Sequence, residues 1–261
     1  MEISYTVVFE APEWAIMVDS EDLPNAHYQL QSYWQENAPQ PERAVDPTVI
    51  DSGWYGVLAY LGIIWSIPAL QGWVDTDLRQ IGALHAAAVQ EGELWRAATA
   101  LTLHSDLAHI ASNSVFGVLF GLFVGRYLGS GFGWLLVLGC GALANLVNGL
   151  IQHDNFRAIG ASTATFAALG LVPAFGWRRG YFRGQGYKRG FAPLFGAIAI
   201  LVFTGFGAGN IDVGGHLLGF LMGIGAGLWW GRRGVPTDVG DQQRAGIAAT
   251  ALLLLAWGLA F

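Results

Sequence analysis

Charged side chains are scarce in this sequence. Asp, Glu, Lys and Arg make up 12% of the 261 residues, whereas a soluble globular domain carries about 25%. Hydrophobic residues, by contrast, make up 53%. This composition argues against an ordinary soluble domain and points to a protein that lies in lipid. The formal net charge of -6 also argues against nucleic acid as a partner, because nucleic-acid-binding proteins are generally basic.

Cysteine is nearly absent as well. The single cysteine, Cys140, lies inside an apolar stretch, so we expect neither disulfides nor a cysteine metal cluster. Three histidines, His104, His109 and His216, offer zinc ligands, but the sequence has no H-E-x-x-H motif to complete a metalloprotease site. Zinc binding is therefore the less favoured alternative, and we expect no metal and no cofactor.

What the sequence does have is long uncharged stretches. A membrane-spanning helix needs about 20 mostly apolar residues, with about 17 as the lower limit. The stretches that meet this requirement predict an all-α, polytopic membrane bundle of seven helices. They are Ser52–Val74, Leu107–Gly125, Tyr127–Gln152, Ala158–Trp177, Gly190–Ile211, Val213–Gly231 and Ala245–Phe261.

The first 51 residues differ from the rest of the chain. They are rich in Asp and Glu and contain no apolar core, so we expect no cleaved signal peptide. Alternating apolar residues from Ile3 to Phe9 predict a strand, and Ala15–Val18 predicts a second one. Pro24–Asn37 predicts a short helix with its proline in the first turn. We expect residues 1–51 to form a small soluble segment on the cytoplasmic side.

The distribution of Lys and Arg predicts the orientation in the membrane. With a cytoplasmic N-terminus, only Arg79, Arg96 and Arg157 fall on the outer side. The other basic residues near the spans then all face the cytoplasm, as the positive-inside rule requires. They are Arg126, Arg178, Arg179, Arg183, Lys188, Arg189, Arg232, Arg233 and Arg244. We therefore expect a multi-pass protein of the cell membrane.

Small residues predict which helices touch. In the sixth stretch glycine recurs at every fourth position from Gly215 to Gly231, which forms a ridge that another helix can approach closely. The fourth stretch offers a matching small face at Gly160, Ala164 and Ala168. We expect these two helices to pack together, although such ridges also occur in bundles without chemistry.

Four polar residues lie where the membrane makes them costly: His109, Asn113, Ser162 and His216. In the predicted topology the second, fourth and sixth helices all begin on the outer side, so these residues converge just below the outer surface. A hydroxyl nucleophile beside a histidine base, with donors for a developing oxyanion, suits acyl transfer. Taken singly, a serine that caps a helix and a histidine that packs in a bundle remain ordinary alternatives.

Three segments together resemble the rhomboid family of intramembrane serine proteases, in the family's order and helix placement. The resemblance extends over about Trp54 to Gly231, and it implies a six-helix core at residues 52–233. Residues 234–261 would then supply a linker and a seventh, C-terminal transmembrane helix. The three segments are Glu93 to Arg96 followed by Leu103 to Asn113, Gly160-Ala161-Ser162-Thr163-Ala164, and Gly215-His216-Leu217-Leu218-Gly219.

The resemblance also implies roles for individual residues. Ser162 would attack a peptide carbonyl and His216 would accept its proton, while His109 and Asn113 would stabilise the oxyanion. Phe166 matches an aromatic position that packs against the catalytic imidazole. The substrates would be transmembrane segments of other membrane proteins, cut near the outer surface, with no cofactor. Gly160 and Gly219 belong to the motifs as supporting residues.

The sequence departs from the family pattern at two motif positions and at Gly125-Arg126-Tyr127, where the E-x-R pattern common at the cytoplasmic end of the second helix is lost. Thr163 follows the nucleophile where the family most often has Gly, and it could crowd the oxyanion site. Gly215 replaces the usual Ala. Thr163 keeps open the alternative of a catalytically inactive relative that binds membrane clients. A small transporter is disfavoured, because the spans contain no carboxylates and no paired broken helices.

Overall fold

The computed structural model describes residues 3–10, 12–38, 45–184, 192, 195–200 and 212–261. The chain forms two compact units, residues 1–43 and residues 44–261, and each is described by itself. The first contains β1 (Tyr5–Glu10), β2 (Glu13–Val18) and α1 (Leu23–Glu36). The two strands pair antiparallel, with Tyr5 opposite Val18. The predicted strand, strand and helix are confirmed, and Pro24 lies in the first turn of α1.

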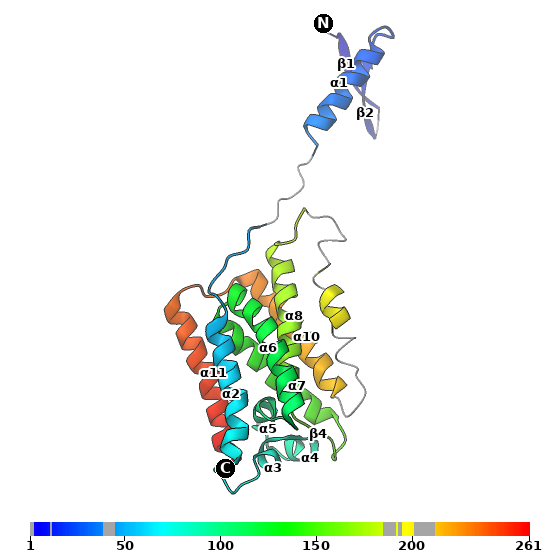
Figure 1. Cartoon of the computed structure of the whole chain (residues 1–261). Helices are drawn as coiled ribbons and strands as arrows, with labels where there is room; N and C mark the ends of the chain where they lie inside the picture. Colours follow the sequence, from blue (N-terminus) through cyan, green and yellow to red (C-terminus); the bar gives the residue numbers. More distant parts are fainter. Residues whose placement is uncertain (1–2, 11, 39–44, 185–191, 193–194, 201–211) are drawn as a thin grey trace. The chain divides into compact units, whose positions relative to one another are not determined.

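The second unit is a bundle of long helices with a group of short elements at one end (Figure 1). Residues 45–51 belong to this unit, because the Asp51 carboxylate accepts the Ser130 backbone N–H at 2.7 Å. The long helices are α2 (Trp54–Gln71), α6 (Leu107–Leu128), α7 (Ser130–Ile151), α8 (Ser162–Arg179), α10 (Val213–Arg233) and α11 (Val239–Ala260).

Within the described residues, five helices are long and apolar enough to cross a membrane: α2, α6, α7, α10 and α11. They correspond to five of the seven predicted spans. Helix α8 occupies the fourth predicted span, but it starts with Ser162 and ends with Arg178 and Arg179, which lower its mean hydropathy. Most of the predicted span Gly190–Ile211 lies outside the described residues.

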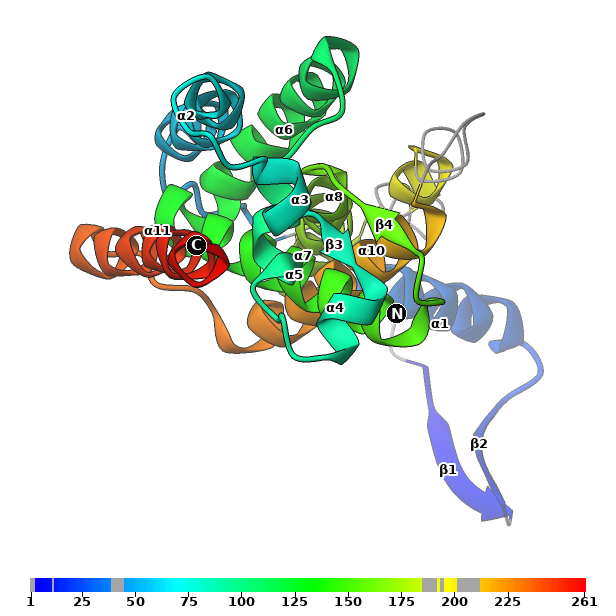
Figure 2. The same ribbon diagram turned by 90° about the horizontal axis from the view of Figure 1, so that it is seen from below.

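Helix α8 lies at the centre of the bundle. Helices α6, α7 and α10 all pack against it, as the view along the bundle shows (Figure 2). Twelve of its 18 residues are buried, whereas in the five apolar helices 17% to 33% of an 18-residue window is buried. A helix in this position contacts protein rather than lipid on nearly every side, so it can carry polar residues that a peripheral span could not.

The predicted contact between the fourth and sixth helices is confirmed, because α8 packs more extensively on α10 than any other pair of long helices. A Cβ atom at Gly219 would collide with the Thr163 carbonyl oxygen, and one at Gly223 would collide with that of Ala167. Glycine is therefore required for the two backbones to approach this closely.

The prediction that α8 meets α10 through the face of Ala164 and Ala168 was wrong. Ala164 packs against Gly141 of α7, and Ala168 belongs to the same core cluster as Val137 of α7. The contact with α10 runs instead through Thr163, Ala167 and Leu171. The error has a simple cause: α8 carries small residues on several faces, so small size alone could not show which face meets the glycine ridge.

Between α2 and α6 the chain folds into short elements that cover one end of the bundle. Buried Arg96 organises them: its guanidinium pairs with Glu93 at 2.5 Å and donates to the backbone carbonyls of Gln80 and Ala83 at 3.0 and 2.9 Å. The elements are α3 (Leu78–Gly82), β3 (Leu84–His85), α4 (Ala86–Gln90), α5 (Arg96–Thr99) and the 3-10 helix η1 (Ala100–Thr102); β3 pairs with β4 (Arg157–Ala158).

Candidate active site

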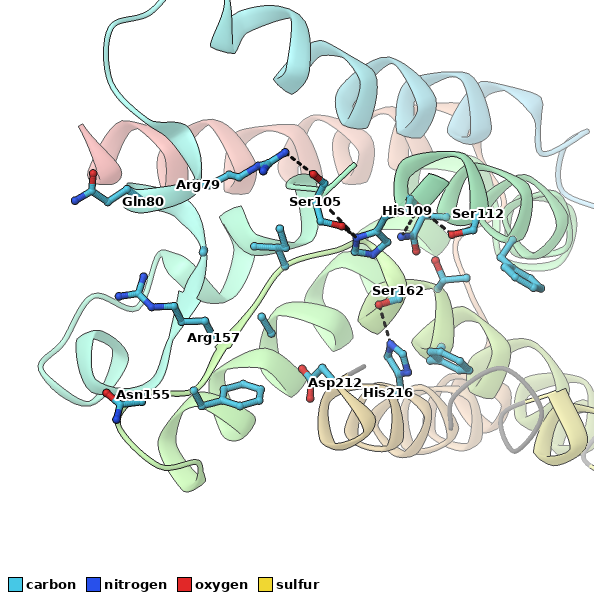
Figure 3. A pocket seen from close by; sticks show the side chains of 18 of the residues that line it. Arg79, Gln80, Ser105, His109, Ser112, Asn155, Arg157, Ser162, Asp212 and His216 are labelled. Atoms are coloured by element: carbon cyan, nitrogen blue, oxygen red, sulfur yellow. Dashed lines mark hydrogen bonds between the residues drawn. The ribbon is translucent and has the colours of Figure 1, made fainter. Parts of the chain in front are cut away.

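The starts of α8 and α10 bring a serine and a histidine together. Ser162 is the first residue of α8, and His216 lies in the first turn of α10. The Ser162 Oγ lies 2.8 Å from the His216 Nε2, within hydrogen-bonding distance (Figure 3). His216 is buried, with 7% of its surface exposed, whereas Ser162 is partly exposed. This pair has the geometry of a hydroxyl nucleophile and its general base.

The start of α10 is fixed by two residues that the sequence analysis did not single out. Asp212 caps the helix, since its carboxylate accepts the Gly215 backbone N–H at 2.7 Å. The fully buried Asn148 of α7 donates its side-chain N–H groups to both oxygens of the same carboxylate, at 3.0 and 2.9 Å. An Asp just before an apolar stretch is a sequence signal for a helix cap. No sequence signal marked Asn148 of α7 as its partner.

Phe166 lies against the imidazole of His216. The ring centroids are 4.4 Å apart and the rings are inclined by 36°. Phe166 is one turn after Ser162 on α8, so both side chains emerge from the same face of that helix. The aromatic ring therefore limits how far the imidazole can tilt away from the Ser162 hydroxyl.

His109 of α6 faces the serine. Its Nδ1 lies 3.1 Å from the Ser105 hydroxyl oxygen and 3.4 Å from the Ser105 backbone nitrogen, which can only donate. The Nε2 atom would be 2.7 Å from a Cβ placed on Gly160, and the Ser162 Oγ would be 3.5 Å from that same Cβ. Gly160, with φ of +134°, thus leaves open the space between the His109 Nε2 and the serine hydroxyl.

Asn113 lies one turn further along α6 and is 5% exposed. One of its amide hydrogens is donated to the His109 carbonyl oxygen at 3.1 Å. The backbone carbonyl oxygen of Asn113 accepts a hydrogen bond from the Tyr60 hydroxyl at 2.9 Å, which ties α6 to α2. Sequence reasoning missed Tyr60, because a tyrosine in an apolar stretch is common and nothing marked its partner.

His104 supports the turn before Ser162. Its Nε2 lies 3.5 Å from the backbone nitrogen of Ala161, and its ring meets that of His109 edge to face at 5.1 Å. Burial lowers the pKa of His104 to about 4, with the His109 charge adding to the effect. A neutral His104 can accept the Ala161 N–H. No cluster of three potential metal ligands occurs in the part of the chain that the structure describes.

The two motif positions that depart from the family pattern, Thr163 and Gly215, lie against each other. Thr163 Oγ1 would be 3.1 Å from a Cβ on Gly215, and Thr163 Cγ2 would be 3.2 Å from one on Gly219. The threonine side chain therefore points into the contact between α8 and α10, and it is not among the described residues that line the cavity over Ser162. Gly215 leaves room for the larger residue at position 163.

A cavity of about 1110 Å³ opens over the serine and the histidine. All four polar residues singled out in the sequence line it, together with Phe166. Its wall combines charged groups with aromatic rings, from Arg79, Arg157, Asp212, Phe116, Phe120 and Phe156 (Figure 3). The site can therefore hold an extended chain that is largely apolar beside a nucleophile, a base and hydrogen-bond donors.

Comparison with known proteins identifies the family. Residues 91–233 match the rhomboid domain, which is more than half of the chain. Rhomboid-like protease 2 from Toxoplasma gondii is 30% identical over 159 residues, which cover 58% of this chain and 53% of that protein. Rhomboid protease GluP from Bacillus subtilis is 31% identical over 145 residues, or 55% of this chain and 27% of GluP.

A third relative, the Bacillus subtilis protein YdcA, is 28% identical over 173 residues, which cover 64% of this chain and 83% of YdcA. The chain thus spans about half of the Toxoplasma relative and about a quarter of GluP. The matched domain contains α6, α7, α8 and α10, and with them every residue of the site except Tyr60 and part of the cavity wall. This multi-pass membrane protein belongs to the rhomboid family.

Proposed function

We propose that this protein is an intramembrane serine endopeptidase that uses Ser162 and His216 to hydrolyse peptide bonds in transmembrane segments of other proteins. The observation that carries the proposal is the 2.8 Å distance between the Ser162 Oγ and the His216 Nε2 in an open cavity. The names of the relatives, which are called proteases, agree with it.

The reaction follows from the two side chains. The Ser162 oxygen attacks the substrate carbonyl while His216 Nε2 takes its proton. His216 then gives that proton to the leaving amine, which leaves an acyl group on Ser162, and a water molecule activated by the same histidine hydrolyses it. Phe166 packs against the imidazole of His216 and so helps to orient it.

His109 and Asn113 serve as oxyanion donors. The Nε2 of His109 borders the open space beside Gly160, next to the serine oxygen, and it is a donor in the tautomer that carries the proton on Nε2. Asn113 lines the same cavity, and one of its two amide hydrogens stays available after the bond to the His109 carbonyl. The backbone N–H of Ser162, in the first turn of α8, is a third donor. Donors aimed at the developing charge lower the barrier of acyl transfer.

The substrate class and the orientation complete the proposal. The cavity lies at the end of the bundle where α6, α8 and α10 begin, and its aromatic wall suits a segment that unwinds from the bilayer. The positive-inside distribution of Lys and Arg supports an orientation with this end on the outer side and the N-terminus in the cytoplasm.

The decisive experiment compares the purified protein with Ser162→Ala on a generic single-span substrate in detergent. We expect cleavage by the wild type, none by the variant, and fluorophosphonate labelling of the wild type only. An inactive client-binding relative would neither cleave nor react at Ser162 across several substrates. Its main sequence support, Thr163, is weakened because that side chain points away from the cavity.

A further inference from the structure

Helix α11 lies beyond the residues that match the rhomboid domain, yet it is attached to the bundle near both of its ends. Near its start, the Gln242 side chain accepts the backbone N–H groups of Gly131 and Phe132 at 3.1 and 2.9 Å. Near its end, the indole N–H of Trp257 donates to the Thr102 hydroxyl oxygen at 3.2 Å. The second attachment is on η1, next to the candidate active site.

The contact between Trp257 and η1 combines a hydrogen bond with close packing. The Thr102 hydroxyl donates its own proton to the Thr99 carbonyl at 2.8 Å, so its oxygen is oriented to accept the indole N–H. The indole ring lies over Gly82, where a Cβ would be 2.7 Å from the ring edge, and it packs in one apolar cluster with Leu103. The C-terminal end of η1 is therefore in contact with Trp257 through both a hydrogen bond and apolar packing.

On its other side, η1 holds the turn that presents the nucleophile. The Gly160 backbone N–H donates to the Ala100 carbonyl at 2.9 Å. The Ala161 backbone N–H points to His104, two residues after η1, at 3.5 Å. Residues 100–104 thus lie between Trp257 and the two residues that precede Ser162, so a shift of η1 moves Gly160 relative to His109 and His216.

We propose that Trp257 and Thr102 are positioning residues for the nucleophile: α11 holds η1, and η1 holds the Gly160–Ser162 turn in the geometry that catalysis needs. This inference rests on the proposed function for its catalytic consequence, but the mechanical coupling from Trp257 to the turn stands on the hydrogen bonds alone. Neither residue touches the dyad, so loss of the contact changes the turnover of bound substrate rather than its binding.

Hydrogen exchange measured by mass spectrometry tests the coupling without any activity. The variants are Trp257→Phe, which removes the indole N–H and keeps a ring, and Thr102→Val, which removes its acceptor. We expect exchange in peptides covering residues 99–105 and 157–163 to rise about threefold or more, as the loss of one hydrogen bond implies. Exchange in the middle of α7 and α10 should stay unchanged.

Two matched variants serve as controls. Thr102→Ser keeps the hydroxyl, and Trp73→Phe makes the same aromatic change at a residue that is 88% exposed. Both should exchange like the wild type. Unchanged exchange in Trp257→Phe and Thr102→Val would overturn the coupling. So would a rise of equal size throughout the bundle, because it would mean general destabilisation instead of a local link.

Steady-state cleavage then tests the catalytic consequence. We expect kcat to fall about two- to tenfold in Trp257→Phe and in Thr102→Val, with KM unchanged and full activity in Thr102→Ser. The double variant should be no slower than the slower single variant, since Thr102→Val already removes the hydrogen bond that Trp257→Phe removes. If the wild type itself cleaves nothing and Ser162 resists fluorophosphonate, the proposed function fails while the exchange data still decide the coupling. Wild-type kcat in both variants with altered exchange would overturn the catalytic role.

Discussion

The two sides of Ser162 are held by different forces. On the side of α10, the two helices are held by close packing. Glycines of α10 lie directly against backbone carbonyl oxygens of α8, and Phe166 packs on His216. Toward α6 there is open space, bordered by a chain of hydrogen bonds from Ser105 through His109 and Asn113 to Tyr60. Close packing fixes the distance between nucleophile and base, whereas a hydrogen-bonded wall leaves room for a substrate and still orients donors toward it.

On the α10 side, removal of the base His216 should give the largest loss of cleavage. In His216→Ala we expect cleavage to fall by about 10⁴-fold or more, because the serine hydroxyl then lacks its proton acceptor. The fold should persist, since the alanine leaves the glycine contacts of α10 intact. Measurement of cleavage and of the melting temperature (Tm) together checks this; wild-type cleavage in the variant would refute the dyad.

Loss of one oxyanion donor on the α6 side should reduce cleavage less than loss of the base. Asn113→Ala removes an amide that faces the cavity, and we expect kcat to fall by about 10²-fold with little change in KM. Tyr60→Phe is the matched variant: it removes only the hydroxyl that binds the Asn113 backbone carbonyl. Single-turnover cleavage should rank it between the wild type and Asn113→Ala. A Tyr60→Phe effect as large as that of Asn113→Ala would show that the backbone, not the amide, matters.

Overpacking of the glycine contact should affect both stability and rate. Gly219→Ala places a Cβ against the Thr163 carbonyl and pushes α10 away from α8. We expect the free energy of unfolding to fall by about 1–3 kcal/mol and cleavage to fall with it. Gly225→Ala on the same helix is the control, because a Cβ there meets nothing within 4 Å. Thermal unfolding that ranks the two variants equally would contradict the packing account.

The smallest expected effect is on the pH dependence of stability, and it comes from His104, next to the hydrogen-bonded side. The pKa of His104 is lowered from 6.5 to about 4 by burial, so between these values the unfolded chain binds a proton that the folded protein does not. Stability should therefore fall as the pH falls from about 6.5 to about 4. In His104→Gln this component is absent, and Tm should depend less on pH over that range. Equal pH dependence in both proteins would exclude the effect.

Much of the fold could be predicted from the sequence because membrane helices are marked by composition alone. Five of the predicted spans appear as described helices of the expected length and character, and α8 follows at the fourth position. The N-terminal strands and helix were within two residues of their predicted limits. Helix rotation was not predictable for α8, where Ala164 and Ala167 have the same size but face different neighbours.

The candidate site was predictable where a polar residue stood out against an apolar background. His109, Asn113, Ser162 and His216 were found in this way, and the structure brings all four to one cavity. Their roles as base, nucleophile and oxyanion donors remain predictions. Asn148, Tyr60 and the link from Trp257 to Thr102 were missed, because each joins residues far apart in sequence and each residue alone has an ordinary place in a helix.

The sequence by itself determined that the chain is a helical membrane protein, since the cost of charge and unpaired backbone in lipid leaves few other options for its long apolar stretches. It also determined which helices carry glycine and which carry polar side chains. Only the tertiary structure decided which side chains meet. The 2.8 Å contact of Ser162 with His216 and the position of Thr163 depend on the rotation and spacing of α8 and α10. Those are set by van der Waals contact between whole helices, which no local pattern encodes.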